Sequence, residues 1–246
     1  MGGAVAAGLA RTDTEGMYDI TVATPHPGKV SALGALGVSL TASNTEAADG
    51  ADCVIVAVKP WVLPGVLEEI RGHLNAGAEV CVIVAGVSCA DLVGMFGNDC
   101  PEALSIAMPN TAMTVGESMT FIVEARGAAT AACGIFSLLG RVKVITERQL
   151  PGATALASCG IAYAMRYVRA ACEGGVELGF RASEAQEIVA QTLRGAVALL
   201  DREGAHPETE IDKVTTPGGL TIRGLNAMER AGFTNAVIEG LKASVK

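Results

Sequence analysis

The sequence lacks the features that would point to a membrane protein or a secreted one. Its 246 residues are 50% hydrophobic with a mean hydropathy of +0.40, but no uninterrupted apolar run reaches the roughly 20 residues that cross a bilayer. The first residues show no basic leader, leucine-rich stretch or cleavage site of a secretory signal. We therefore expect a soluble, cytoplasmic protein without a membrane partner.

Basic charge and metal ligands are also scarce. Acidic residues outnumber basic ones by 26 to 18, and the net charge of -8 argues against a nucleic-acid partner, whose phosphates need a basic surface. None of the three histidines, His26, His73 and His206, has a second ligand at metal-binding spacing. The seven cysteines form no CxxC pair, so we expect reduced, structural thiols and no metal site. A small-molecule substrate remains as the interpretation.

The first part of the chain has the pattern of a doubly wound α/β domain. Short apolar runs rich in Val and Ile alternate with helical stretches, which predicts a parallel sheet covered on both faces. A helix is expected over 62–74 and a strand nearer an edge over 119–125. The four predicted inner strands are 19–24, 53–58, 79–86 and 103–108. We assign residues 1–146 to a dinucleotide-binding domain of the Rossmann type.

The remaining residues, 147–246, predict an all-helical domain. Ser183 followed by Gln186 predicts a capping box, and an apolar stripe from Val189 to Leu200 is expected to end at Gly204. The stretch 153–175 is apolar on more than one face, which about 100 residues cannot easily bury alone. We expect a second copy of the chain to cover it.

The start, MGGAVAAGLA, is similar to the tail of a dinucleotide fingerprint, with Gly2 as the last glycine, which opens a phosphate-binding helix. The strand and two glycines that belong before it are not in the sequence. The first strand is therefore expected to be missing, which would weaken the sheet and cofactor binding. Lost upstream residues, a start assigned too late and a chain with poor cofactor affinity all remain open.

Residues at the ends of the predicted strands are candidates for cofactor binding, because the carboxyl ends of parallel strands line the ligand crevice. Three such ends provide AVKP, VAGVS and MPNT. The predicted cofactor-binding residues, apart from Gly2, are Thr24, Asn44, Ala57, Val58, Lys59, Pro60, Ala85, Gly86 and Asn110.

The turn after the strand 19–24 bears on the choice of cofactor. An NAD enzyme usually places an acidic residue there for the ribose hydroxyl, but TPHPGK has none. This absence favours NADPH, with Thr24, His26 or Lys29 near its extra phosphate, and leaves NADH as the alternative.

Four motifs together, AVKP at 57–60, MPNT at 108–111, TALASCGIAYA at 154–164 and VTTPGGLTIRGL at 214–225, resemble the delta-1-pyrroline-5-carboxylate reductase family. The resemblance implies a Rossmann domain followed by a helical domain that forms a homodimer, or a higher homo-oligomer. It also implies NAD(P)H-dependent reduction of a cyclic imine to proline, the last step of proline biosynthesis.

The same resemblance implies the substrate site. The segment 214–225 is expected to be a non-helical loop in which Thr216, Pro217, Gly218 and Gly219 wrap the substrate carboxylate with backbone amides. Thr221 matches the threonine that meets the ring nitrogen and is the catalytic candidate.

Two further substrate-binding candidates carry alternatives. Glu147 matches a family carboxylate near the substrate, although capping a helix would explain it equally well. The run ASCGIAY departs from the family's SGSGPAY, so Ser158 is expected to substitute for the usual hydroxyls. Cys159, beside it, is interpreted as a spectator thiol, with reactivity as the alternative.

Two other functions compete with the imine reductase. A non-catalytic dimeric relative with impaired cofactor binding would explain the missing glycines. A beta-hydroxyacid dehydrogenase shares the two-part architecture but needs a lysine in the helical half, and no Lys lies between 143 and 213.

Overall fold

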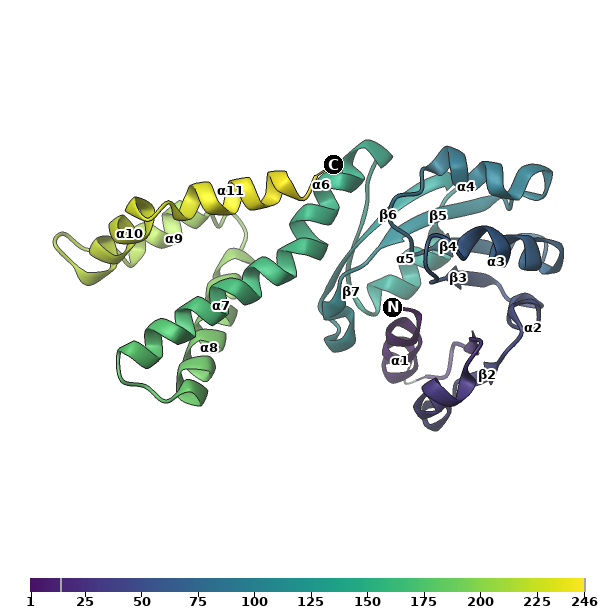
Figure 1. Ribbon diagram of the computed structural model, residues 1–246, viewed down its shortest axis with the longest axis horizontal. Helices are drawn as coiled ribbons and strands as arrows, with labels where there is room; N and C mark the ends of the chain where they lie inside the picture. Colours follow the sequence, from purple (N-terminus) through teal and green to yellow (C-terminus); the bar gives the residue numbers. More distant parts are fainter. Residues whose placement is uncertain (14, 246) are drawn as a thin grey trace. The chain divides into compact units, whose positions relative to one another are not determined.

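The computed structural model describes residues 1–13 and 15–245, and the chain divides into two compact units, Met1–Ser158 and Cys159–Lys246. The first unit combines a sheet with helices, and the second consists of helices, as Figure 1 shows. This confirms the predicted class, a Rossmann-like α/β domain followed by a helical one.

The strands of the first unit form two sheets. Five of them make a mixed sheet in the order β3-β4-β5-β6-β7, and β1 pairs with β2 in a parallel two-stranded sheet. Their bounds are β1 Thr21–Ala23, β2 Ser39–Thr41, β3 Cys53–Val56, β4 Glu79–Val82, β5 Ala103–Met108, β6 Ser118–Arg126 and β7 Gly140–Val144. The strands β3, β4 and β5 are parallel, so their carboxyl ends share one edge.

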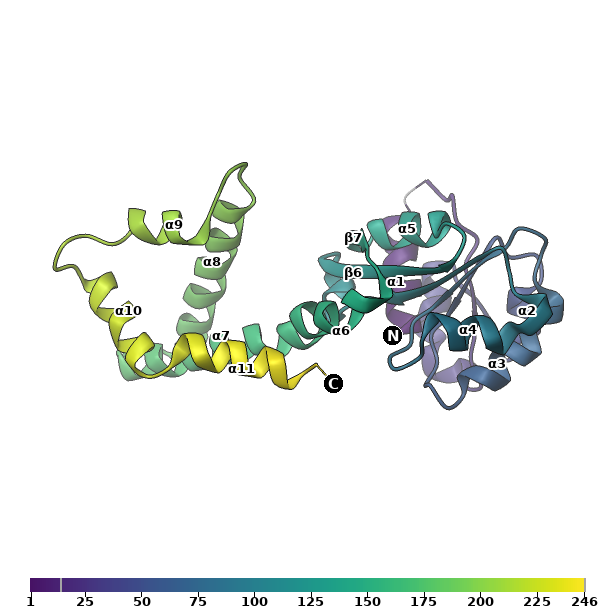
Figure 2. The same ribbon diagram turned by 90° about the horizontal axis from the view of Figure 1, so that it is seen from above.

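Helices cover both faces of the larger sheet (Figure 2). Successive strand residues point to opposite faces, and Val80 and Val82 pack with one group of helices while Cys81 and Ile83 pack with the other. The first group is α3 (Leu63–Ile70) and α4 (Cys89–Phe96); the second is α1 (Gly2–Thr12) and α5 (Thr130–Ser137). This two-sided burial is why the strands read as continuous apolar runs.

Short helical elements join these parts. They are α2 Asn44–Ala48, α6 Leu150–Ala153, the 3-10 segments η1 Pro27–Leu36, η2 Arg71–His73, η3 Gly97–Asp99, η4 Thr111–Val115 and η5 Glu147–Gln149, and the π-helix η6 Thr154–Cys159.

Three features of the sheet differ from the sequence prediction. The strand β6 runs antiparallel to β5, whereas the alternation of strands and helices predicts parallel pairing. The strands β2 and β7 were not predicted, because β2 has three residues and β7 alternates apolar residues with Arg141 and Lys143. At the start of β7 only glycine fits, since a Cβ on Gly140 would lie 2.1 Å from the Ser118 carbonyl oxygen.

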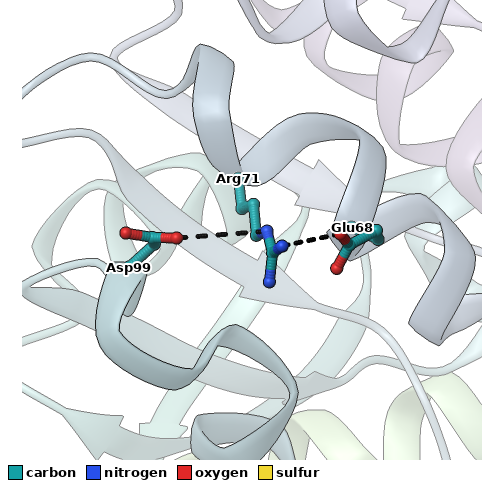
Figure 3. Close-up of polar contacts among 3 residues, drawn as sticks. All are labelled: Glu68, Arg71 and Asp99. Atoms are coloured by element: carbon teal, nitrogen blue, oxygen red, sulfur yellow. Dashed lines mark hydrogen bonds and ion pairs between the residues drawn. The ribbon is translucent and has the colours of Figure 1, made fainter.

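Charged side chains gather at the opposite edge of the sheet, where the chain enters β4 and β5 (Figure 3). Arg71 donates from Nη2 to Glu68 Oε1 at 2.6 Å, and its Nε lies 4.0 Å from Asp99 Oδ2. All three side chains are more than a third exposed, so each pair contributes less than about 1 kcal/mol.

Up to residue 245, the second unit contains five helices, with bounds α7 Gly160–Glu177, α8 Ala182–Leu200, α9 Pro207–Lys213, α10 Leu220–Arg230 and α11 Phe233–Ala243. The predicted capping box at Ser183 is wrong. Ser183 lies inside α8, and Glu184 Oε2 accepts from the Arg181 amide at 2.9 Å. The helix also ends at Leu200, before the predicted Gly204. Within the described residues, no helix has both the length and the apolar character to cross a membrane.

Candidate functional site

The loops that follow β3 and β4 lie at the carboxyl edge of the sheet. Lys59 and Pro60 are exposed in a tight turn, closed by the Val62 amide donating to the Lys59 carbonyl at 2.9 Å. Lys59 forms no ion pair with any described residue, so its ammonium group is available to a ligand. After β4, Ala85 and Gly86 are exposed, and Gly86 has a φ of 78°.

The beginning of α1 approaches the same edge closely. The helix starts at Gly2, as predicted, and a Cβ on Gly2 would lie 3.1 Å from Ala57 Cβ. No side chain caps the first turn of α1. Its amides are therefore candidates for a phosphate group, because an uncapped helix N-terminus favours an anion.

The turn after β1 brings together the residues proposed to meet the extra phosphate of NADPH. Thr24 donates its amide to the Thr41 carbonyl at 3.0 Å, and Lys29 donates its amide to the His26 carbonyl at 3.0 Å. Asn44, at the start of α2, donates from Nδ2 to Glu69 Oε2 at 2.7 Å.

Asn110 faces inward at the end of β5. The residue is buried, Oδ1 accepts from the Ala112 amide at 3.0 Å, and Nδ2 donates to the Ala157 carbonyl at 3.4 Å. Ser158 donates from Oγ to the Pro109 carbonyl at 3.4 Å. These contacts join the end of β5 to the π-helix η6, an irregular element of a kind common at functional sites.

Glu147 lies at the start of η5 and contacts another helix. Its Oε1 accepts from the Cys89 amide, the first of α4, at 2.8 Å. Burial, together with the charge and hydrogen bond of Glu147, raises the pKa of the Cys89 thiol to about 11. The two residues line a cavity of about 470 Å³ with Glu124, Val144 and neighbours. Helix capping, the alternative stated for Glu147, is the contact that the structure shows.

The Pro-Gly-Gly segment in the helical unit forms a tight turn. The Gly219 amide donates to the Thr216 carbonyl at 2.9 Å, and Gly218 has a φ of 68°, so the turn needs glycine. The expectation that the whole of 214–225 is non-helical is wrong, because α10 begins at Leu220. Thr221 is exposed in its first turn, which no side chain caps.

Sequence reasoning missed Cys89 as the partner of Glu147 and Ala157 as the partner of Asn110. These contacts join residues 58 and 47 positions apart, and nothing local in the sequence marks them. It also passed over Trp61, the sole tryptophan, which is 78% exposed directly after Pro60.

The first unit, with helices on both faces of its sheet and loops at the carboxyl edge, and the helical second unit define a class of two-part proteins with a Rossmann-type domain. A family model described as pyrroline-5-carboxylate reductase dimerisation matches residues 147–246, and one described as NADP oxidoreductase, coenzyme F420-dependent, matches residues 1–86.

Individual relatives point to the same family as the dimerisation model. Pyrroline-5-carboxylate reductase 1 of Dictyostelium discoideum is 38% identical over 99% of this chain, which spans 47% of that protein, about half its length. Pyrroline-5-carboxylate reductase of Synechocystis is 36% identical, with 97% of this chain and 91% of the relative covered. The crystal structure of Plasmodium falciparum pyrroline carboxylate reductase with NADP bound has a TM-score of 0.87 at 25% identity, covering 100% of this chain and 92% of that one.

The chain therefore belongs to the pyrroline-5-carboxylate reductase family, a family of oxidoreductases. This confirms the resemblance found in the sequence. The match of 147–246 to the dimerisation model also identifies the helical part as a module for homo-oligomerisation.

Proposed function

We propose that this chain reduces 1-pyrroline-5-carboxylate to L-proline with NADPH and works as a homodimer. The observation that carries the proposal is the turn Thr216–Gly219 leading into the uncapped start of α10, on which Thr221 is exposed. Family membership, the NADP bound to the Plasmodium relative and the NADP oxidoreductase model over 1–86 support the activity and the cofactor.

The turn has a defined share in binding the substrate. The Gly219 amide closes the turn, so it cannot also face a carboxylate. The amides at the start of α10, beginning with Leu220 and Thr221, have no capping side chain and are directed outward from a helix N-terminus, which favours a negative charge. We assign the substrate carboxylate to these amides, with Thr216, Pro217 and Gly218 shaping the turn.

Two hydroxyl groups, one in each unit, are proposed to take part in the reaction, those of Thr221 and Ser158. The Thr221 hydroxyl aligns the ring nitrogen, which takes up a proton from water and keeps it as the C=N bond becomes a single bond. Bound NADPH supplies the hydride to the imine carbon. Ser158 contributes a hydroxyl beside Asn110, from a helix that the end of β5 holds in place.

The cofactor is assigned to the carboxyl edge of the first unit. Ala57, Val58, Lys59 and Pro60 follow β3, Ala85 and Gly86 follow β4, and Gly2 opens α1 next to Ala57. Lys59, which forms no ion pair with the residues that the structure describes, offers its ammonium group there. Thr24 and Asn44 are proposed to hold the adenosine end, while Asn110 orders the loop after β5.

The test is an absorbance assay of NADPH oxidation with pyrroline-5-carboxylate, run beside a binding measurement. Saturation with NADPH at 100 times its dissociation constant should stabilise the protein by about 2.7 kcal/mol, and the emission of Trp61 should change on binding. Binding of NADPH without turnover of the imine would overturn the proposed substrate. If the protein shows no NADPH binding and no turnover, the non-catalytic relative is the explanation.

The role of Thr221 has its own test. Thr221→Ala should lower kcat/KM for the imine by about 10²- to 10⁴-fold, the range of general acid contributions, while the Kd for NADPH stays unchanged. Thr192→Ala is the matched control, because it removes the same atoms from an exposed position on α8. Equal losses of imine reduction and NADPH affinity would contradict the role.

A further inference from the structure

Glu147 and α4 are joined by a contact that the family resemblance does not explain. The Cys89 amide is one of the first amides of α4, which have no partner within the helix. Ser88 Oγ satisfies the Asp91 amide at 3.0 Å, and Glu147 Oε1 satisfies the Cys89 amide at 2.8 Å. The start of α4 is therefore capped twice, once by its own N-cap and once from 58 residues further along the chain.

The capped end of α4 borders a loop of the proposed cofactor site. Residues 83–88 connect β4 to α4, and the loop 85–88 within this connection includes Ala85 and Gly86, both exposed. At its other end the loop follows Ile83, whose amide donates to the Val56 carbonyl at 2.8 Å. The sheet thus fixes one end of the loop, and the bond from Glu147 fixes the other.

The carboxylate also affects where an anion can bind. A negative charge at a helix N-terminus already satisfies the positive end of the helix dipole and repels a phosphate. Because Glu147 occupies the start of α4, the uncapped start of α1 is the better place for the cofactor phosphates.

We propose that Glu147 is a positioning residue for the cofactor loop 85–88, which it holds by capping α4, and that it is not a ligand of the imine. The kinetic part of this proposal rests on the proposed function. The capping part does not, because it concerns the order of the loop in the free protein.

Two substitutions separate the roles. Glu147→Gln keeps an oxygen that can accept from the Cys89 amide but removes the charge, whereas Glu147→Ala removes both. Glu124→Ala is the matched control, since Glu124 lines the same cavity and its Oε1 accepts from the Ala129 amide, at the start of α5, at 3.0 Å.

The first readout is hydrogen exchange of the amides in 85–91 without any ligand. Glu147→Ala should speed this exchange about tenfold, which corresponds to the loss of one hydrogen bond, and Glu147→Gln by less than twofold. Glu124→Ala should leave it unchanged. Exchange that does not respond to Glu147→Ala would overturn the proposal whether or not the protein reduces the imine.

The second readout is affinity. Glu147→Ala should raise the Kd for NADPH about tenfold, with the Gln variant within twofold of the parent, and the KM for the imine should stay constant in both. If Glu147 bound the imine, Gln would be as damaging as Ala, and the KM for the imine would rise. That result would overturn the positioning role.

The third readout needs only folded protein. The Cys89 thiol should become more reactive in Glu147→Gln, because the carboxylate no longer opposes its ionisation. Alkylation mapped to the peptide that contains Cys89 should be faster in this variant than in the parent. An unchanged rate would show that the two side chains do not meet in solution and would overturn the proposal.

Discussion

The two units of this chain bury apolar surface in opposite ways. The first unit closes its core within one chain, with Phe96, Phe136, Leu63 and Ile122 all at or near 0% exposure. In the described part of the second unit, Ala185 is the single buried apolar residue. Large side chains stay exposed on four of its helices and in its loops, with Leu178 at 82%.

This difference shows how each unit gains stability. A sheet between two layers of helices buries both of its faces, and two apolar clusters lie on opposite sides of β4. The helical unit has several exposed apolar faces, which in a folded protein mark a surface that another chain covers. The exposed apolar residues therefore agree with the family model of this segment, which is described as a dimerisation model.

The largest expected contrast comes from deleting the same side chain in each unit. Phe136→Ala should cost about 3–5 kcal/mol, because it leaves a cavity in the core. Phe180→Ala removes an identical ring that is 48% exposed in the helical unit, and in dilute protein it should cost less than about 1 kcal/mol. Urea unfolding measures both. Equal costs at the lowest protein concentration would break the comparison.

Dilution should give the next largest effect. A 100-fold dilution should lower the unfolding free energy of the helical unit by about 2.7 kcal/mol, since its folded state is stabilised by a second copy. The sheet unit should not respond. Hydrogen exchange of amides in α8 and in β4, measured at both concentrations, gives the two free energies. An equal response of α8 and β4 would show that the two units are stabilised together.

The fold was predictable wherever burial leaves a clear pattern of apolar residues in the local sequence. The strands β3, β4 and β5 read as apolar runs because helices cover both of their faces. The direction of β6 was not predictable, because its pairing with β5 depends on a partner outside the local sequence. The strand β7 was missed because Arg141 and Lys143 interrupt its apolar pattern.

The candidate site divides in the same manner. Lys59, Pro60 and Gly86 could be placed at the carboxyl edge of the sheet because each lies within four residues of the end of a strand. The capping contact of Glu147 and the inward position of Asn110 could not, because each depends on a segment about 50 residues away. The amide donors proposed for the substrate also differ from those predicted, because the Gly219 amide is used within the turn Thr216–Gly219.

The smallest expected effect concerns pH and again distinguishes the units. Burial in the sheet unit raises the pKa of the Cys81 thiol to about 12, from 9.0 in the unfolded chain. The fold therefore favours the neutral thiol, and this contribution is complete below about pH 9 and is lost as the pH rises towards 12. Between about pH 9 and 10 it should remove about 1 kcal/mol of stability.

Comparing Cys81→Ala with the parent isolates this contribution from every other group that titrates in alkali. The variant should unfold more easily at neutral pH, because it leaves a small cavity, yet its stability should fall less steeply above pH 9. Cys172→Ala, made in α7 of the helical unit, is the matched deletion of a thiol. If the unfolding free energy of both variants, measured with urea, falls with pH as steeply as that of the parent, the thiol of Cys81 ionises as freely in the folded protein as in the unfolded one. The contrast in burial between the two units would then not extend to their ionisable groups.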